Sequence, residues 1–144
     1  MTDAEHFRKL EQLYAAAPIS QWYGATAAIA DGHAEVRFAI RPEFLHAAHA
    51  VHGSVYFRAL DDAAFFAANS HVRDVLVLTV SFTVQLVRPV VSGEFRASGR
   101  LVHAGGRLLV AESTLVNDEG ELLAHGSGTF MKSSIALEAS IGYV

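Results

Sequence analysis

The segment from residue 52 to residue 70 constrains the fold of this chain more than any other. It reads HGSVYFRALDDAAFFAANS, and its apolar side chains recur on nearly every face of a helix. Such a helix is normally buried in a protein core. Two adjacent carboxylates, Asp61 and Asp62, lie in its middle, and a buried carboxylate is costly unless it is paired or used in chemistry. The segment therefore predicts a long central helix over residues 53–70 that carries a functional acid.

The composition favours one soluble domain over residues 1–144 that associates with copies of itself. Hydrophobic residues make up 51% of the chain, and charged residues only 18%, which is below the usual quarter, so part of the surface is expected to be buried against another subunit. A net charge of −4 argues against nucleic acid and anionic membranes as partners. The absence of cysteine excludes disulfides and thiolate chemistry. Without a signal peptide or membrane-spanning pattern, we expect a cytoplasmic protein.

The rest of the pattern predicts an α+β domain in which about six strands form a curved antiparallel sheet around the central helix. Thr2 and Glu5 are spaced as a capping box for an N-terminal helix within residues 1–18, which Pro18 ends. Short turns between strands indicate antiparallel pairing. The segment 74–88 alternates along its whole length and would span ~50 Å, so it is expected to bend. The six expected strands cover residues 22–31, 33–41, 74–88, 93–103, 107–117 and 121–131.

The spacing of Gly53 and Asp61 predicts a dimer. Free backbone N–H groups at the start of the central helix can hold an oxygen that carries negative charge, and a carboxylate can act as base or nucleophile. The two residues lie ~12 Å apart along one helix, too far to act on one reacting group. Two antiparallel helices across a twofold axis would bring Gly53 of one protomer to Asp61 of the other. Asp62 lies one turn from Arg58 and is expected to pair with it.

At this point the chain resembles the hotdog-fold thioesterases of the 4-hydroxybenzoyl-CoA thioesterase superfamily, in the branch related to the phenylacetic-acid-degradation thioesterases. The resemblance extends from about residue 20 to residue 132. The matching residues are His52-Gly53, Asp61, Ala63, Ala67-Ala68-Asn69-Ser70, Arg88-Pro89, Gly93 and Gly126-Ser127-Gly128-Thr129-Phe130.

The resemblance implies a hotdog fold and hydrolysis of acyl-CoA thioesters, with an aryl or medium-chain acyl group. It also implies a homodimer that associates as a dimer of dimers, with no metal and no cofactor other than the coenzyme A of the substrate. In the family, the acid at the Asp61 position is base or nucleophile, and the N–H at the Gly53 position polarises the carbonyl. His52 would help to place the carbonyl end, and Thr79 would orient the attacking water.

Four further residues are candidates for substrate binding. His46 stands where many relatives carry an asparagine, and His49 stands where a glycine is usual. Ser54 replaces a second glycine and is a candidate helix cap. Arg88 and Arg107 could meet the phosphates of coenzyme A, although ordinary solvated positions at strand ends explain both arginines equally.

Three other functions compete with the thioesterase. A non-catalytic acyl-CoA-binding or sensing module would keep the pocket and lose the acid, and a hotdog hydratase or dehydratase would need a different loop motif. A purely structural oligomer gives no reason for Asp61. The spacing of His46, His49 and His52 suggests a zinc site, but the sequence offers no ligands to complete it, so no metal is expected.

Overall fold

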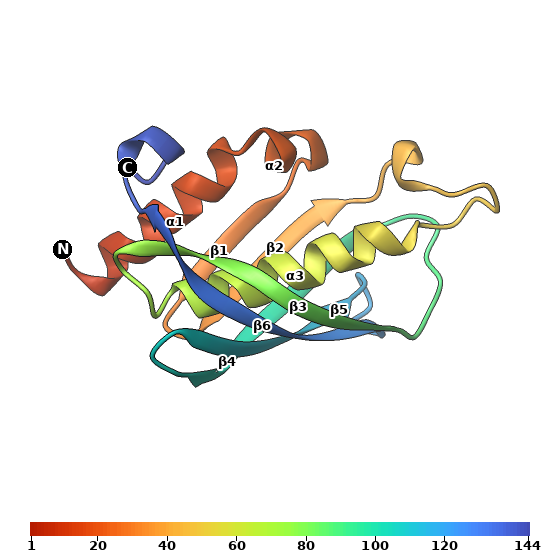
Figure 1. Cartoon of the computed structure of the whole chain (residues 1–144). Helices are drawn as coiled ribbons and strands as arrows, with labels where there is room; N and C mark the ends of the chain where they lie inside the picture. The colour runs from red at the N-terminus through yellow and green to blue at the C-terminus, as the bar shows by residue number, and fades with distance from the viewer.

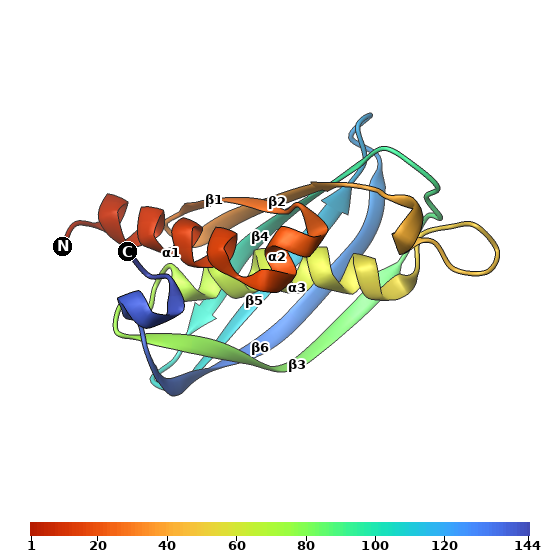
Figure 2. The ribbon, with the colours of Figure 1, turned by 90° about the horizontal axis from the view of Figure 1, so that it is seen from above.

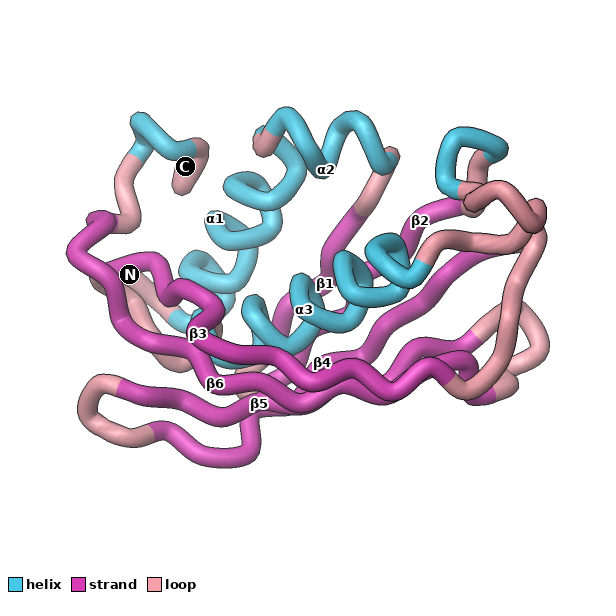
Figure 3. Tube along the Cα trace, turned by 45° about the vertical axis from the view of Figure 1, so that its right-hand side comes forward, coloured by secondary structure: helices cyan, strands magenta, loops and turns pink.

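Helix α3 lies against one face of a curved antiparallel sheet, and α1 and α2 cover the same side of the sheet (Figures 1 and 3). The computed structural model describes residues 1–144. In chain order the elements are α1 (Asp3–Ala16), α2 (Pro18–Tyr23), β1 (Thr26–Ala30), β2 (His33–Ala39), η1 (Pro42–Phe44), α3 (Gly53–Asn69), β3 (Val75–Leu86), β4 (Glu94–Ala104), β5 (Leu108–Val116), β6 (Leu122–Ala136) and η2 (Ala139–Ile141).

The six strands form one sheet in the order β1-β2-β4-β5-β6-β3, and every neighbouring pair is antiparallel. Helix α3 connects β2 to β3, which pairs only with β6 and therefore forms a free edge of the sheet. Seen from above, α1 and α2 run beside α3, and the loop that leads into α3 extends beyond the sheet (Figure 2). This is the hotdog architecture, and it confirms the predicted α+β fold with a central helix.

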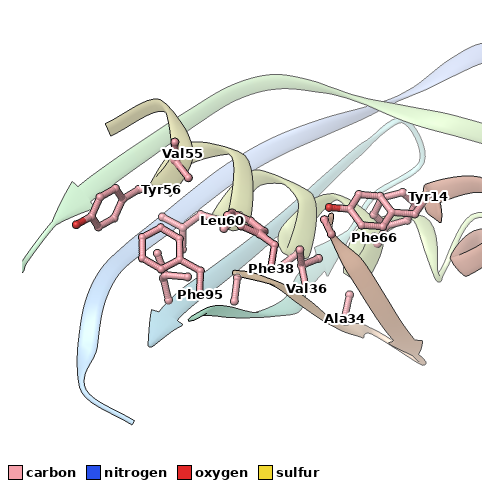
Figure 4. Packing of buried hydrophobic residues seen from close by; sticks show 14 of the residues in the cluster. Tyr14, Ala34, Val36, Phe38, Val55, Tyr56, Leu60, Phe66 and Phe95 are labelled. Carbon is pink, nitrogen blue, oxygen red and sulfur yellow. The ribbon is translucent and has the colours of Figure 1, made fainter. Parts of the chain in front are cut away.

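The backbone of α3 lies directly on the middle of the sheet. A Cβ atom added to Gly99 of β4 would lie 2.1 Å from the carbonyl oxygen of Ala63, so only glycine permits this approach. In β5, the Ser113 hydroxyl donates a 2.7 Å hydrogen bond to the carbonyl of Leu60. Buried side chains of α3 and of the strands fill the remaining space (Figure 4). None of the helices has both the length and the hydropathy needed to cross a membrane.

The capping box of Thr2 and Glu5 is present as predicted, but the expected strand over residues 22–31 was wrong at its start. Pro18 does not simply end the first helix, because it occupies the first turn of α2, where a missing N–H costs nothing. Gly24 ends α2 in the left-handed conformation, at φ 68°, and β1 begins only at Thr26. Trp22 and Tyr23 are therefore helical.

The expected regular alternation along residues 74–88 was also wrong, although the strand bends as predicted. A β-bulge shifts the register of β3 against β6 between Thr79 and Ser81. Val77 before the bulge is fully buried, whereas after it Phe82 turns toward the core. A bulge re-aims side chains and increases the local twist. Odd-numbered residues of β3 therefore face α3 before the bulge, and even-numbered residues face it after the bulge.

Asn69 fixes where β3 starts relative to α3. Its buried side-chain amide donates to the carbonyls of Val72 (3.1 Å) and Val75 (3.2 Å), and its oxygen accepts from the N–H of Val77 (2.9 Å). The bonds to Val75 and Val77 join the last turn of α3 to the first residues of β3, and the bond to Val72 holds the turn between them. They set the register in which the side chain of Thr79 reaches the middle of the helix.

Candidate active site

The start of α3 presents an unused backbone donor. Gly53 is the first helical residue, and its N–H donates to no group of the protein. The side chain that caps the helix is His52, whose Nδ1 accepts from the N–H of Ser54 at 3.1 Å; Ser54 itself is not the cap. Because Nδ1 is an acceptor, the neutral ring of His52 carries its proton on Nε2. Two N–H donors are thus available at the positive end of the helix dipole.

The chain's own packing does not require a glycine at position 53. The residue has ordinary helical backbone angles, and a Cβ atom there would approach only Leu86 Cδ1, at 3.5 Å. An alanine would therefore fit within the protomer. The bare backbone at this position leaves room for the close approach of a group outside the chain, which is a use that glycine commonly has.

Asp61 lies in the middle of α3 and accepts a 2.8 Å hydrogen bond at Oδ1 from the Thr79 hydroxyl of β3. Burial raises the pKa of Asp61, while the Thr79 hydrogen bond and the charge of Arg58 oppose that rise. The carboxylate lines a hollow of about 170 Å³ between α1, α2, α3 and β3, which we call the Asp61 hollow. The structure thus brings together two predicted site residues that are 18 positions apart in the chain.

Asp62 has different surroundings from its neighbour. Its Oδ2 lies 2.6 Å from Arg58 Nε and accepts a 2.7 Å hydrogen bond from the Tyr14 hydroxyl, and only 13% of its side chain is exposed. The predicted pairing with Arg58 is therefore present. Burial raises the pKa of Asp62 to about 6, against the charge of Arg58 and the Tyr14 hydrogen bond. Arg58 and Tyr14 both hold the Asp62 carboxylate in place, whereas Asp61 has neither of these partners at such distances.

Within one protomer, Gly53 and Asp61 do not share a site. Gly53 lines a second hollow of about 300 Å³, together with His46, Leu86 and Arg88, which we call the Gly53 hollow. The Asp61 hollow contains none of these residues, and the helical rise separates the two positions by ~12 Å. One chain therefore supplies an acid at one place and an unpaired backbone N–H at another.

The edge strand β3 carries the surface that a second protomer could cover. Its backbone is unpaired on one side, and its exposed side chains include Leu78, Val80 and Leu86, which are 42%, 56% and 57% exposed. Phe57 of α3 is also 40% exposed. An apolar edge strand with an open backbone is a template for pairing with another chain.

The predicted substrate-binding residues do not all meet. His46 and Arg88 line the Gly53 hollow, where His46 Nδ1 accepts from the N–H of Ala48 (3.0 Å) and Arg88 pairs with Glu121 (3.2 Å). Arg107 lies in the turn between β4 and β5, at the opposite end of the protomer from the start of α3 (Figure 1).

The loop before α3 holds His49 in a backbone conformation that favours glycine. His49 adopts φ 62°, and it is the one non-glycine residue of the chain with a positive φ. Glycine adopts this region without strain, whereas histidine tolerates it at a cost. Across the chain, no group of three His, Asp or Glu side chains is arranged to hold a metal ion.

The sequence pattern did not reveal the residues that hold the Arg58–Asp62 pair from the N-terminal helices. Tyr14 reaches Asp62 from α1, and Ser20 of α2 accepts from Arg58 Nη2 at 3.2 Å. In the sequence, Tyr14 recurs with Phe7 and Leu10 at helical spacing and reads only as an apolar helix position, and Ser20 belongs to no motif. Asn69 was noted as part of the motif, although its side-chain role was not predicted.

Comparisons with known proteins show which family the chain resembles. The family model of the thioesterase superfamily matches residues 48–124. A protein of Archaeoglobus fulgidus named "Putative esterase" is 30% identical over 100 residues, which cover 69% of this chain and 64% of that protein, less than two thirds of its length.

Solved structures share the fold. The conserved protein PA5202 from Pseudomonas aeruginosa is 30% identical, with a TM-score of 0.77, and the match covers 81% of this chain and 94% of that one. The E. coli PaaI protein from the phenylacetic acid degradation operon has a TM-score of 0.85 at 18% identity, over 94% of this chain and 99% of that one. The thioesterase HI1161 from Haemophilus influenzae has a TM-score of 0.80 at 18% identity, over 92% and 93%.

Proposed function

This chain belongs to the thioesterase superfamily, and on that premise we propose that it hydrolyses acyl-coenzyme A thioesters, with an aryl or medium-chain acyl group, in a homodimer. The proposal rests on the Asp61–Thr79 pair: a partly buried carboxylate, oriented by one hydroxyl, lines a hollow on an otherwise apolar helix. Asp61 is the only acid of the helix without a cation within ion-pair distance, so its charge is available for chemistry.

Each active site would combine two protomers. Gly53 of one protomer would face Asp61 of its partner when the β3 edges pair across a twofold axis, and the dimer would contain two equivalent sites. The thioester carbonyl would accept hydrogen bonds from the Gly53 N–H and from His52 Nε2, both at the start of α3. Such donors stabilise the oxyanion that develops during acyl transfer. Two such dimers would associate as a dimer of dimers.

Two routes lead from this arrangement to the products. In the first, Asp61 takes a proton from water held by Thr79, and the water oxygen attacks the carbonyl carbon. The C–S bond of the tetrahedral intermediate then breaks, and the thiolate takes the proton from Asp61. In the second, the Asp61 carboxylate attacks and expels the thiolate, and water then hydrolyses the mixed anhydride. Both routes need Asp61 ionised before attack.

The Gly53 hollow would receive the coenzyme A arm of the substrate. His46 and Arg88 would contact this arm, because both line the hollow. Ser54 lines a different hollow, together with His52 and Trp22, so it would meet the substrate only outside the Gly53 hollow. Arg107 lies far from this hollow within one protomer, so it would meet a phosphate only through a neighbouring protomer.

The first experiment is thiol release from short-chain, long-chain and phenylacetyl-CoA, with wild type, Asp61→Asn and Asp62→Asn compared. We expect Asp61→Asn to abolish most turnover and leave the oligomer intact, whereas Asp62→Asn should cost far less. Equal losses in both variants would contradict the assignment of Asp61. Absence of release with retained binding would instead favour the acyl-CoA-binding module.

A second experiment tests the shared site. Gly53→Pro removes the N–H and adds a ring. Proline is tolerated at the first helical position, and His52 already has φ −64° and ψ 142°, which a following proline permits. We expect a 100-fold to 1,000-fold loss relative to Gly53→Ala, on the order of that for one oxyanion donor. Gly53→Ala keeps the donor and, like proline, adds a Cβ at the bare backbone, so it controls for the lost space.

Mixing the two inactive variants distinguishes a shared site from one built within a single chain. A heterodimer of Asp61→Asn and Gly53→Pro protomers has one site with both residues intact and one with both replaced. After subunit exchange at equal amounts, about a quarter of the wild-type activity should return. If the mixture stays as inactive as its components while heterodimers form, the composite site is wrong.

A further inference from the structure

The Asp61 hollow contains two carboxylates and a single cation. Arg58 lies one turn before Asp61 and Asp62 on the same face of α3, and no other charged side chain lines the hollow. With all three groups ionised, the hollow carries one net negative charge. The two acids therefore compete for the charge of Arg58.

The guanidinium of Arg58 is held beside both acids by contacts from three helices. Its Nε lies 2.6 Å from Asp62 Oδ2 without the alignment of a hydrogen bond, and its Nη2 donates to Ser20. The guanidinium also packs over the rings of Tyr14 and Tyr23, at 5.8 and 5.2 Å from their centroids. Only 15% of the side chain is exposed. Arg58 is thus fixed in place beside the acids of the hollow.

We propose that Arg58 is a positioning residue for hydrolysis: it is the shared cation that keeps Asp61 ionised in a buried site, and Asp62 controls how much of that charge acts on Asp61. The inference rests on the proposed role of Asp61 as base or nucleophile and deepens it. In this role Arg58 would act on the reaction through the charge of Asp61.

The surroundings of the two acids support this division. Burial is the largest influence on both carboxyls and raises the pKa of each, and the charge of Arg58 acts against that rise in both. From α1, the Tyr14 hydroxyl faces Asp62 and stays neutral, because burial raises its pKa. From α2, Tyr23 packs on Arg58, and from β3 the neutral Thr79 hydroxyl faces Asp61.

Replacing Arg58 and replacing Asp62 should shift the pKa of Asp61 in opposite directions. Arg58→Gln removes the attraction, so the acid limb of the kcat/KM profile should move up by about one pH unit. Asp62→Asn removes the competing carboxylate, so the limb should move down. This second shift should be smaller, because Asp62 with a pKa of about 6 is already partly protonated on the acid side.

Two further variants separate charge from packing. Arg58→Lys should keep the limb near its wild-type position. The double variant Arg58→Gln/Asp62→Asn leaves no unpaired carboxylate at position 62, so it should fold even where Arg58→Gln does not, and its limb should fall between those of the single variants. A merely structural role would lower activity in every variant without moving the limb.

The ionisation of Asp61 should also be followed directly by NMR titration of its carboxyl carbon, assigned with Asp61→Asn. This measurement separates the inference from the proposed function, since it reports on Asp61 even if no thioester is cleaved. Shifts of opposite sign in Arg58→Gln and Asp62→Asn would support the shared cation. Shifts of the same sign, or none, would overturn it.

Discussion

Replacing Thr79 with valine should make Asp61 harder to ionise. The two side chains have nearly the same shape, but valine lacks the hydroxyl that donates to Asp61 Oδ1 at 2.8 Å. A hydrogen bond to a charged group contributes about 1.5–3 kcal/mol, and one pKa unit corresponds to about 1.4 kcal/mol. Since the bond favours the ionised carboxylate, its loss should raise the pKa of Asp61 by about one to two units.

The assay is kcat/KM for thiol release between pH 5 and pH 9. In Thr79→Val the acid limb should move to higher pH by one to two units, on the order of the hydrogen bond's strength, so the loss of activity should be largest at low pH. Thr79→Ser keeps the hydroxyl and should keep the limb. Thr83→Val changes an exposed threonine on the same strand and controls for effects on β3.

An acid limb that stays in place in Thr79→Val, in a variant that is folded and active, would refute this reasoning. It would mean that the hydroxyl does not stabilise the Asp61 carboxylate in solution. If the limb stays in place and activity falls equally at all pH values, the role of Thr79 would be to orient water alone.

Three further predictions concern stability. Because the pKa of Asp62 in the folded protein is about 6 and its ordinary value is about 3.9, the native state holds its proton more tightly, so stability should fall by about 2 kcal/mol as the pH rises from 4 to 6; denaturant titrations should show this slope in wild type and a flatter one in Asp62→Asn. His49→Gly should raise the free energy of unfolding by about 0.5–1 kcal/mol by relieving the left-handed backbone, and an unchanged denaturation midpoint would contradict this. Gly99→Ala should destabilise by about 3 kcal/mol or more because its Cβ would overlap the carbonyl of Ala63, whereas Gly106→Ala, which meets no atom within 4 Å, should leave the melting temperature unchanged.

Features that depend on neighbours in the chain were predictable from the sequence. The capping box of Thr2 and Glu5 spans three positions, and the Arg58–Asp62 pair spans four, so helical geometry alone places each pair together. The continuous apolar pattern around residue 61 likewise predicted the buried helix. The Asp61–Thr79 contact was expected only from the family resemblance, because no local rule joins a helix to the strand after it.

Features that depend on long-range packing were not predictable. The bulge of β3 after Thr79 arises from its pairing with β6, where a Cβ atom at Gly126 or Gly128 would lie 2.4 Å from the Phe82 ring. The alternating sequence carried no sign of it. Tyr14 looked like any apolar position of a surface helix, and its hydroxyl gained a role only when α1 packed over Asp62.

The sequence by itself determined the buried helix and the place of its two acids, because hydrophobic period and helical spacing are local properties of the chain. Only the tertiary structure decided how the surroundings of Asp61 differ from those of Asp62. Burial removes water from both carboxylates at once, and the groups that replace water come from distant segments: Thr79 for Asp61, and Tyr14 with Arg58 for Asp62. Electrostatics in a partly dry site depends on which groups surround a charge, and folding alone brings those groups together.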